Sequence, residues 1–194
     1  MSLLTDLSND AASLAEQVAP RIVAVRSANG RSSSGFVWRT GLVVTAEEAL
    51  EGEDDAEVLL ADGKVVKATL AGRDPSTDVA LLKLDTAEFG EWSAAGTPRP
   101  ASFALIAGRA EGSLIASLTS VNEAGPAWRS LRGGQIDARI TLALRLGLRT
   151  EGGAVVAPDG TLIGMAVTSP QRRALVIPAS TIGRAVVTLN EKGY

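Results

Sequence analysis

The chain has 194 residues, of which 45% are hydrophobic, and it contains no cysteine and no histidine. This composition suits one all-β unit or two small domains with a packed core, and the lack of cysteine excludes disulfides, thiolate metal sites and a cysteine nucleophile. Without histidine or cysteine, the remaining metal class is a hard cation held by carboxylates, and we expect no cofactor.

The net charge of −3 is unevenly distributed along the chain. Residues 1–96 carry 16 acidic and 8 basic side chains, whereas residues 97–194 carry 6 acidic and 11 basic ones. Either the two halves attract each other within one fold, or the second half presents a basic surface to an anionic partner. Because few aromatic residues accompany these cations, nucleic acid is not an expected partner. The arginines in question are scattered over positions 129, 132, 139, 145, 149, 172 and 173.

Residues 3–18 have their apolar side chains at helical spacing, and Pro20 ends the pattern, which predicts a leading helix. No stretch is long and apolar enough to span a membrane. The first residues also lack the basic and apolar regions of a signal peptide. The compartment therefore stays open: cytoplasm, or periplasm if an export signal has been removed.

From Arg21 onward, short β-branched runs alternate with turn residues. Asp62-Gly63 between two such runs predicts a hairpin. Residues 88–100 are predicted to cross between two halves. Many short strands with no helices between them favour antiparallel barrels. The expected strands are 22–25, 34–38, 42–45, 58–60, 65–70 and 78–84, then 103–107, 114–121, 136–144, 154–156, 162–167 and 175–177.

After Pro178 the periodicity becomes helical again, with Ile182, Ala185 and Leu189 on one face. We expect Ser180 to cap the start of this helix. The sequence predicts a closing helix over about residues 180–192.

Five segments in order resemble the protease domain of HtrA-type trypsin-like serine proteases. The resemblance covers about residues 19–192 and implies an all-β fold, a trypsin-like double six-stranded antiparallel β-barrel with an N-terminal and a C-terminal helix. It implies one domain over 1–194, with barrel 1 at about 19–95 and barrel 2 at about 100–178. A PDZ domain, which commonly follows in such proteins, is not expected within this chain. The segments are 34–37, 42–50, 74–84, 150–164 and 174–180.

Carried over position by position, the resemblance places Glu48 where the catalytic histidine belongs, Asp78 at the aspartate and Glu151 at the serine. Arg149, Thr150 and Glu151 take the positions of the oxyanion hole. Histidine is the usual base that activates a serine near neutral pH, and this chain has none. The resemblance therefore predicts a protease scaffold without triad catalysis, a pseudoprotease.

The acidic replacements leave several interpretations open. Ionised carboxylates crowded at one place repel each other and need a proton, an arginine or a cation. Glu48, Asp78 and Glu151 are thus a candidate cation site, or a candidate carboxylate pair that activates water. Arg149 is expected to pair with Glu48 or Glu151, or to fill the cleft. The acidic run from Glu47 to Glu57 is interpreted as a solvated loop or as a docking surface.

The predicted function is binding of a protein or peptide partner, or a structural or regulatory role. An extended peptide adding to a strand edge beside the groove needs no nucleophile. The alternative is an active hydrolase with a non-standard carboxylate site. By resemblance the protein is expected to form homo-oligomers, as trimers.

Overall fold

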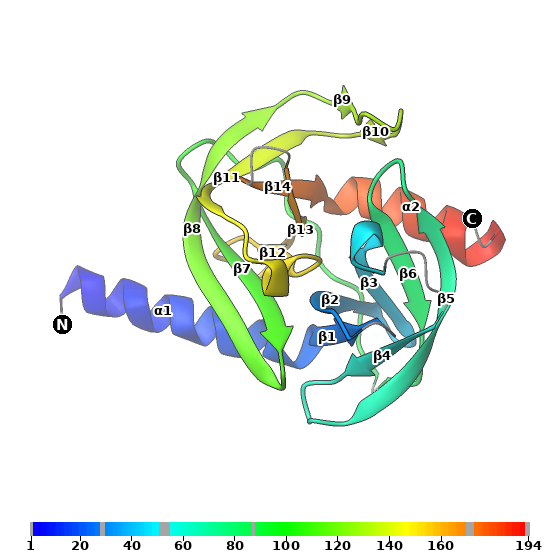
Figure 1. The fold of residues 1–194 in the computed structure, drawn as a ribbon. Coiled ribbons are helices and arrows are strands. Elements are labelled where there is room, and N and C mark those ends of the chain that lie inside the picture. The colour runs from blue at the N-terminus through cyan, green and yellow to red at the C-terminus, as the bar shows by residue number, and fades with distance from the viewer. Residues whose placement is uncertain (1, 28–29, 51–54, 87, 170–172, 193–194) are drawn as a thin grey trace.

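Two closed antiparallel barrels of six strands each lie side by side, with one helix near each end of the chain (Figure 1). The computed structural model describes residues 2–27, 30–50, 55–86, 88–169 and 173–192. This architecture confirms the all-β, double-barrel fold predicted from the sequence.

The first barrel is closed by pairing of its first and fourth strands, in the order β1-β2-β3-β6-β5-β4. The predicted hairpin at Asp62-Gly63 joins β4 to β5, where Gly63 takes a φ of 87° and the main-chain N–H of Lys64 donates to Asp62 Oδ1 at 2.9 Å. The strands are β1 (Ile22–Arg26), β2 (Ser32–Arg39), β3 (Leu42–Ala46), β4 (Asp55–Leu59), β5 (Val65–Asp74) and β6 (Val79–Lys83).

The second barrel has the order β11-β14-β13-β12-β7-β8. The run predicted as one strand at 136–144 is divided in the structure into β10 and β11. Strand β10 pairs with β9, which the sequence did not predict because a strand of two residues has no detectable alternation. The elements are β7 (Phe103–Ala110), β8 (Ser113–Gly125), β9 (Trp128–Arg129), β10 (Gln135–Ile136), β11 (Arg139–Arg145), β12 (Ala154–Val156), β13 (Leu162–Thr168) and β14 (Arg173–Pro178).

The leading helix α1 (Leu3–Val18) begins at Ser2, whose Oγ accepts a hydrogen bond of 3.3 Å from the Thr5 N–H. Only its C-terminal part is buried, and its N-terminal part projects away from the barrels (Figure 1). A short 3₁₀ turn, η1 (Ala19–Arg21), connects it to β1. Among the described residues, no helix is long and apolar enough to cross a membrane.

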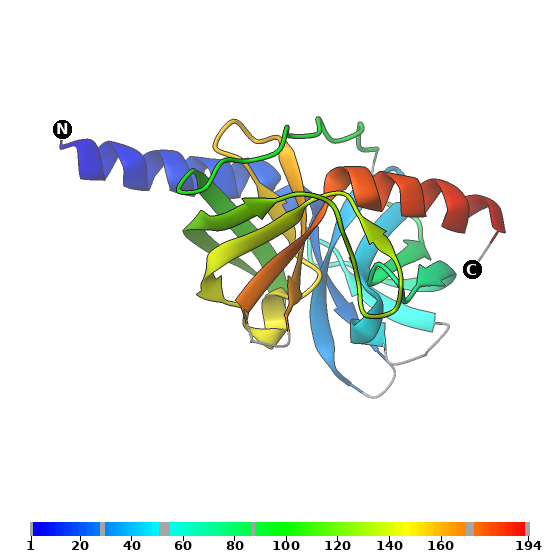
Figure 2. The ribbon, with the colours of Figure 1, turned by 90° about the horizontal axis from the view of Figure 1, so that it is seen from above.

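The closing helix α2 (Ala179–Lys192) contacts β5 and β6 of the first barrel and β13 and β14 of the second (Figure 2). It begins directly after Pro178, so the prediction that Ser180 caps it is wrong: Ser180 lies inside the first turn. The apolar face, including Ile182 and Leu189, is buried as predicted.

Three apolar clusters form the interior: one within each barrel, and a third that combines residues of both barrels and both helices. The third cluster holds Phe36 of β2 beside Trp92, whose ring lies edge-on at 6.0 Å between centroids. Trp92 also donates from Nε1 to the Val37 carbonyl at 2.9 Å. The segment crossing between the halves is thus anchored in the shared core.

Candidate active site

A groove of about 1260 Å³ lies between the barrels, and all three residues predicted at the triad positions line it: Glu48, Asp78 and Glu151. The first barrel contributes the turn at residues 75–78 and the 3₁₀ turn η2 (Glu47–Leu50). The second contributes the β9–β10 hairpin, parts of β11, β13 and β14, and the 3₁₀ turn η3 (Leu148–Thr150). Residues far apart in sequence therefore meet in one place.

Asp78 lies at the turn before β6 with a φ of 56°, a left-handed conformation that aspartate tolerates better than most residues. Its Oδ1 accepts a hydrogen bond of 3.0 Å from the Glu48 N–H, and its carbonyl accepts one of 3.3 Å from the Glu47 N–H. These two bonds hold η2 against the turn and set the position of both glutamates.

The environment of Asp78 raises its pKa from 3.8 to about 7. Burial is the largest cause, and the negative charges of Glu48, Glu151 and Glu47 add to it, while the hydrogen bond from the Glu48 N–H acts in the opposite direction. Asp78 therefore binds a proton over much of the acidic range, which relieves part of the repulsion among these carboxylates.

An arginine that sequence reasoning missed supplies the positive charge at η2. Arg132, at the tip of the β9–β10 hairpin, places its guanidinium 3.2 Å from Glu48 Oε1 and 3.4 Å from Glu47 Oε2. Arg73 adds a longer contact of 3.7 Å to Glu47. The hairpin is also fixed to the first barrel by the Ser130 hydroxyl, which donates to the Ser76 carbonyl at 2.6 Å.

Glu151 is bonded to the protein through its side chain and its main chain. Its Oε1 accepts a hydrogen bond of 3.1 Å from the Thr168 N–H, and its own N–H donates back to the Leu148 carbonyl at 3.4 Å within η3. The next residue, Gly152, has a φ of 81°, and a Cβ there would overlap the Ser34 carbonyl oxygen. Only glycine fits at that position.

Arg149 does not behave as predicted. Its side chain is 65% exposed, and its ion pair is with Glu111, at 4.0 Å. It does not line the groove. The predictions that Arg149 pairs with Glu48 or Glu151, or fills the cleft, are therefore wrong. Only its carbonyl faces inward, where it accepts a hydrogen bond of 2.6 Å from the Ser34 hydroxyl.

Two of the three positions assigned to the oxyanion hole, Thr150 and Glu151, have their N–H groups bonded within the turn. The Thr150 N–H donates to the Gly147 carbonyl at 3.0 Å, as the Glu151 N–H does to Leu148. Both N–H groups thus have carbonyl partners within the turn, whereas oxyanion stabilisation requires N–H groups aimed at the site where negative charge develops.

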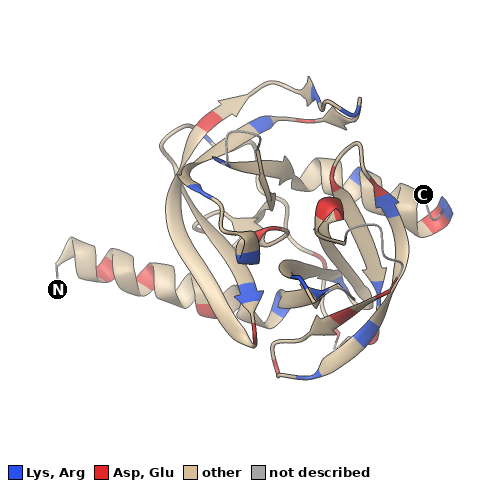
Figure 3. Ribbon diagram, in the orientation of Figure 1, with Lys and Arg blue, Asp and Glu red and all other residues tan. Residues whose placement is uncertain are grey.

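The cation interpretation has no support within the described part of the chain, where no group of three or more histidine, cysteine, aspartate or glutamate side chains could hold a metal ion. Part of the acidic run, residues 51–54, lies outside the described residues. Figure 3 shows acidic residues at η2 in the first barrel and basic residues on strands of the second barrel and on its β9–β10 hairpin, one of which, Arg132, pairs with Glu48.

Two closed six-stranded antiparallel barrels with a groove between them define the trypsin-like class of fold. The model of the trypsin-like peptidase domain family matches residues 33–165. The chain belongs to that family and is an HtrA-type domain within it.

Similar proteins include two bacterial serine proteases named Do-like HtrA. The protein of Lactobacillus helveticus is 28% identical over 177 residues, which cover 79% of this chain and 40% of that protein. The protein of Lactococcus lactis subsp. cremoris is 33% identical over 154 residues, which cover 68% and 36%. The chain thus spans two fifths or less of the length of these relatives.

Two solved structures share the fold. Deg5 superimposes with a TM-score of 0.83 at 23% identity, covering 96% of this chain and 97% of that chain. The protease Rv3671c of M. tuberculosis, in its inactive form, superimposes with a TM-score of 0.78 at 20% identity, covering 94% of each chain. At these identities the likeness establishes the fold alone.

Proposed function

We propose that this trypsin-like domain binds a segment of a partner protein in the groove between its barrels and does not cleave it. The observation that carries the proposal is the state of Glu151, at the position of the nucleophile. Its carboxylate accepts from the Thr168 N–H and its amide donates to the Leu148 carbonyl, so both groups have protein partners. A working site needs a free nucleophile and free N–H donors.

The chemistry around Glu151 supports the same proposal. The sequence has no histidine, and Glu48 at that position is held by Arg132. The imidazole that usually serves as the general base is therefore absent, and the side chain at its position is bound in an ion pair. Loss of the triad serine or histidine lowers turnover by roughly 10⁶ in a related mechanism. Triad catalysis is therefore not part of the proposed function.

The groove itself is suited to an extended polypeptide. Its lining includes the apolar side chains of Leu148, Val167, Leu175 and Ile177. The third apolar cluster contains residues of both barrels, and α2 contacts strands of both. These contacts join the two barrels. We infer that both barrels act as one domain and present one binding surface.

A carboxylate mechanism is the rival function, and the pKa of Asp78 is the observation in its favour. A protonated Asp78 near an ionised Glu151 would offer an acid and a base at the same pH, as in aspartic proteases. Against it, the Glu151 carboxylate is already bonded to the Thr168 N–H.

Binding is tested with a fluorescently labelled, permanently unfolded polypeptide and the purified chain. We expect saturable binding that Leu148→Gln weakens several-fold, because Leu148 lines the groove. Val187→Gln is the matched control, since Val187 is equally exposed at 61% but lies on α2 outside the groove. Equal binding by both variants would contradict the groove as the binding site.

A further inference from the structure

Most of the arginine side chains that line the groove have no carboxylate partner among the described residues. Two of its five arginines have carboxylate partners: Arg132 with Glu48 at 3.2 Å, and Arg139 with Glu123 at 3.4 Å. The other three have no carboxylate within 4.0 Å among the described residues. The five lining arginines are at positions 129, 132, 139, 145 and 173.

Arg145 of β11 and Arg173 of β14 lie directly opposite each other in the antiparallel register, and both residues are exposed. Like charges placed opposite each other in an antiparallel pair are destabilising. A local arrangement that costs stability without a structural gain is typical of functional positions. An anion between the two guanidinium groups would convert this repulsion into two attractive contacts.

The surroundings of this arginine pair indicate what kind of anion fits. Leu148 and Leu175 line the same groove, so the cations lie beside apolar surface. The volume of about 1260 Å³ exceeds that of ordinary small-molecule sites, roughly 300–1,000 Å³. An acidic side chain within an otherwise apolar polypeptide matches both features.

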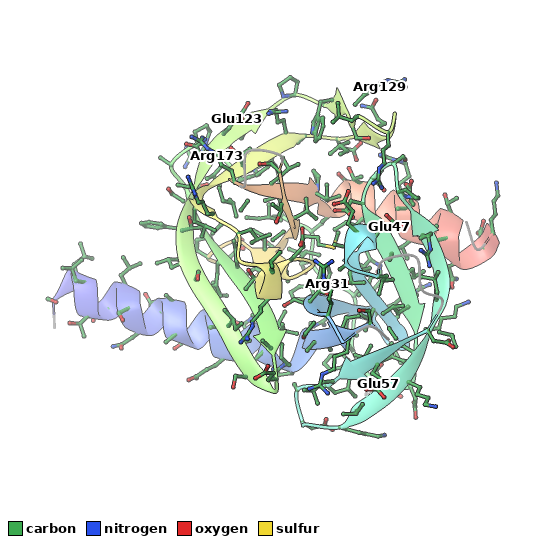
Figure 4. The ribbon with its side chains drawn as sticks, in the orientation of Figure 1. Arg31, Glu47, Glu57, Glu123, Arg129 and Arg173 are labelled. Atoms are coloured by element: carbon green, nitrogen blue, oxygen red, sulfur yellow. The ribbon has the colours of Figure 1, made fainter. Side chains whose placement is uncertain are left out.

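Four acidic residues line the groove: Glu48 and Asp78 come from the first barrel, and Glu123 and Glu151 from the second. Figure 4 shows Arg173 and Glu123 both on the side of the second barrel, where Glu123 already has Arg139 as its partner at 3.4 Å. Glu151 remains in the groove, but its Oε1 is bonded to the Thr168 N–H. Because both second-barrel carboxylates have partners of their own, Arg145 and Arg173 are left to attract a ligand carboxylate at β11 and β14.

We propose that the groove binds an extended segment of a partner protein that places an aspartate or glutamate side chain between Arg145 and Arg173. This inference rests on the proposed non-cleaving, segment-binding function and specifies the chemistry of the segment.

The test uses fluorescence anisotropy with capped, alanine- and valine-rich hexapeptides that differ only in a central Glu, Gln or Lys. A fourth peptide carries the Gln and a free C-terminal carboxylate. We expect the Glu peptide to bind at least tenfold more tightly than the Gln peptide, and each of Arg145→Gln and Arg173→Gln to remove most of that preference. Arg99→Gln is the control, because Arg99 is an exposed arginine outside the groove.

The outcomes separate the inference from the function on which it rests. Equal binding of the Glu and Gln peptides overturns the inference and leaves segment binding intact. Tight binding only of the peptide with a free C-terminus also overturns it, in favour of a terminal carboxylate. Failure of every peptide to bind contradicts both proposals. Melting temperatures of the variants, expected within about 2 °C of the parent because the substituted side chains are exposed, exclude unfolding as the cause.

Discussion

The main-chain N–H of Glu48 donates a hydrogen bond of 3.0 Å to Asp78 Oδ1, so the residue predicted at the histidine position is held through its backbone. Its side chain, 60% exposed, turns instead to Arg132. The Asp78 side chain and the Glu48 main chain thus form the contact between the two positions, while the Glu48 side chain pairs with Arg132.

Asp78 should make the stability of the protein depend on pH. Its pKa is about 7 in the folded chain against an ordinary 3.8, so the folded state binds an additional proton between these values. The free energy of unfolding therefore falls as the pH rises from about 4 to 7, by up to about 1.4 kcal/mol per pH unit from this group. Asn at this position keeps the acceptor for Glu48 and the left-handed φ, so Asp78→Asn should remove this slope.

Urea unfolding of parent and Asp78→Asn across that pH range measures the difference directly. The variant is expected to be the more stable one above neutral pH, because it has no charge to bury. Parallel stability curves for the two proteins would contradict the raised pKa.

The ion pairs of Arg132 connect the hairpin of the second barrel to η2 of the first, but they lie at the surface. We expect Arg132→Gln to lower the free energy of unfolding by only about 0.2–1 kcal/mol at low salt. In about 1 M salt, where charges are screened within roughly 3 Å, the difference should vanish. Chemical unfolding at the two salt concentrations tests this, and a loss above about 2 kcal/mol at both would show a larger role than surface pairing.

Gly152 and Gly63 are compared to test how tightly the loop before Ala154 is packed. Both have left-handed φ values, 81° and 87°, but a Cβ at Gly63 meets nothing within 4 Å. Gly63→Ala should therefore cost only about 1 kcal/mol. Gly152→Ala adds an overlap with the Ser34 carbonyl and should cost roughly 3 kcal/mol or more. Similar costs in thermal or urea unfolding would contradict the close packing at Ser34.

Arg109 is buried, with 4% of its surface exposed, and its guanidinium donates to three carbonyls. The acceptors are Ile22 at 2.7 Å, Gly112 at 2.8 Å and Ala19 at 3.0 Å, so one side chain joins the end of α1 to the second barrel. Arg109→Met leaves these acceptors without their donor and should cost about 3 kcal/mol or more. The exposed Arg99→Met is the control, and equal stability of the two variants would exclude such a role.

The fold was predictable for two reasons. Short strands and turn residues repeat along most of the chain, and five segments occur in the same order as in HtrA-type protease domains. The short β9 was missed, since two residues carry no periodicity. Arg132 was missed for a different reason: nothing local marks an arginine 84 positions from its partner Glu48. Its only signal was the unequal charge of the two halves, which predicted attraction between them and, as the alternative, a basic surface.

For Arg149, by contrast, the sequence predicted a contact that the structure does not contain. Its position beside Glu151 in sequence favoured a pair, but η3 places its side chain toward Glu111 on the outside. The direction of a side chain in a tight turn depends on backbone angles that residue types do not specify. The homotrimer and the compartment remain predictions from resemblance and composition.

The central claim is that the groove holds a polypeptide without cleaving it. The most direct test is prolonged incubation of the purified chain with an unfolded protein substrate, followed by intact mass spectrometry of the substrate, beside the variant Glu151→Ala. We predict that the substrate keeps its full mass with both proteins. Fragments that form with the parent and disappear with Glu151→Ala would contradict the account and establish a carboxylate protease.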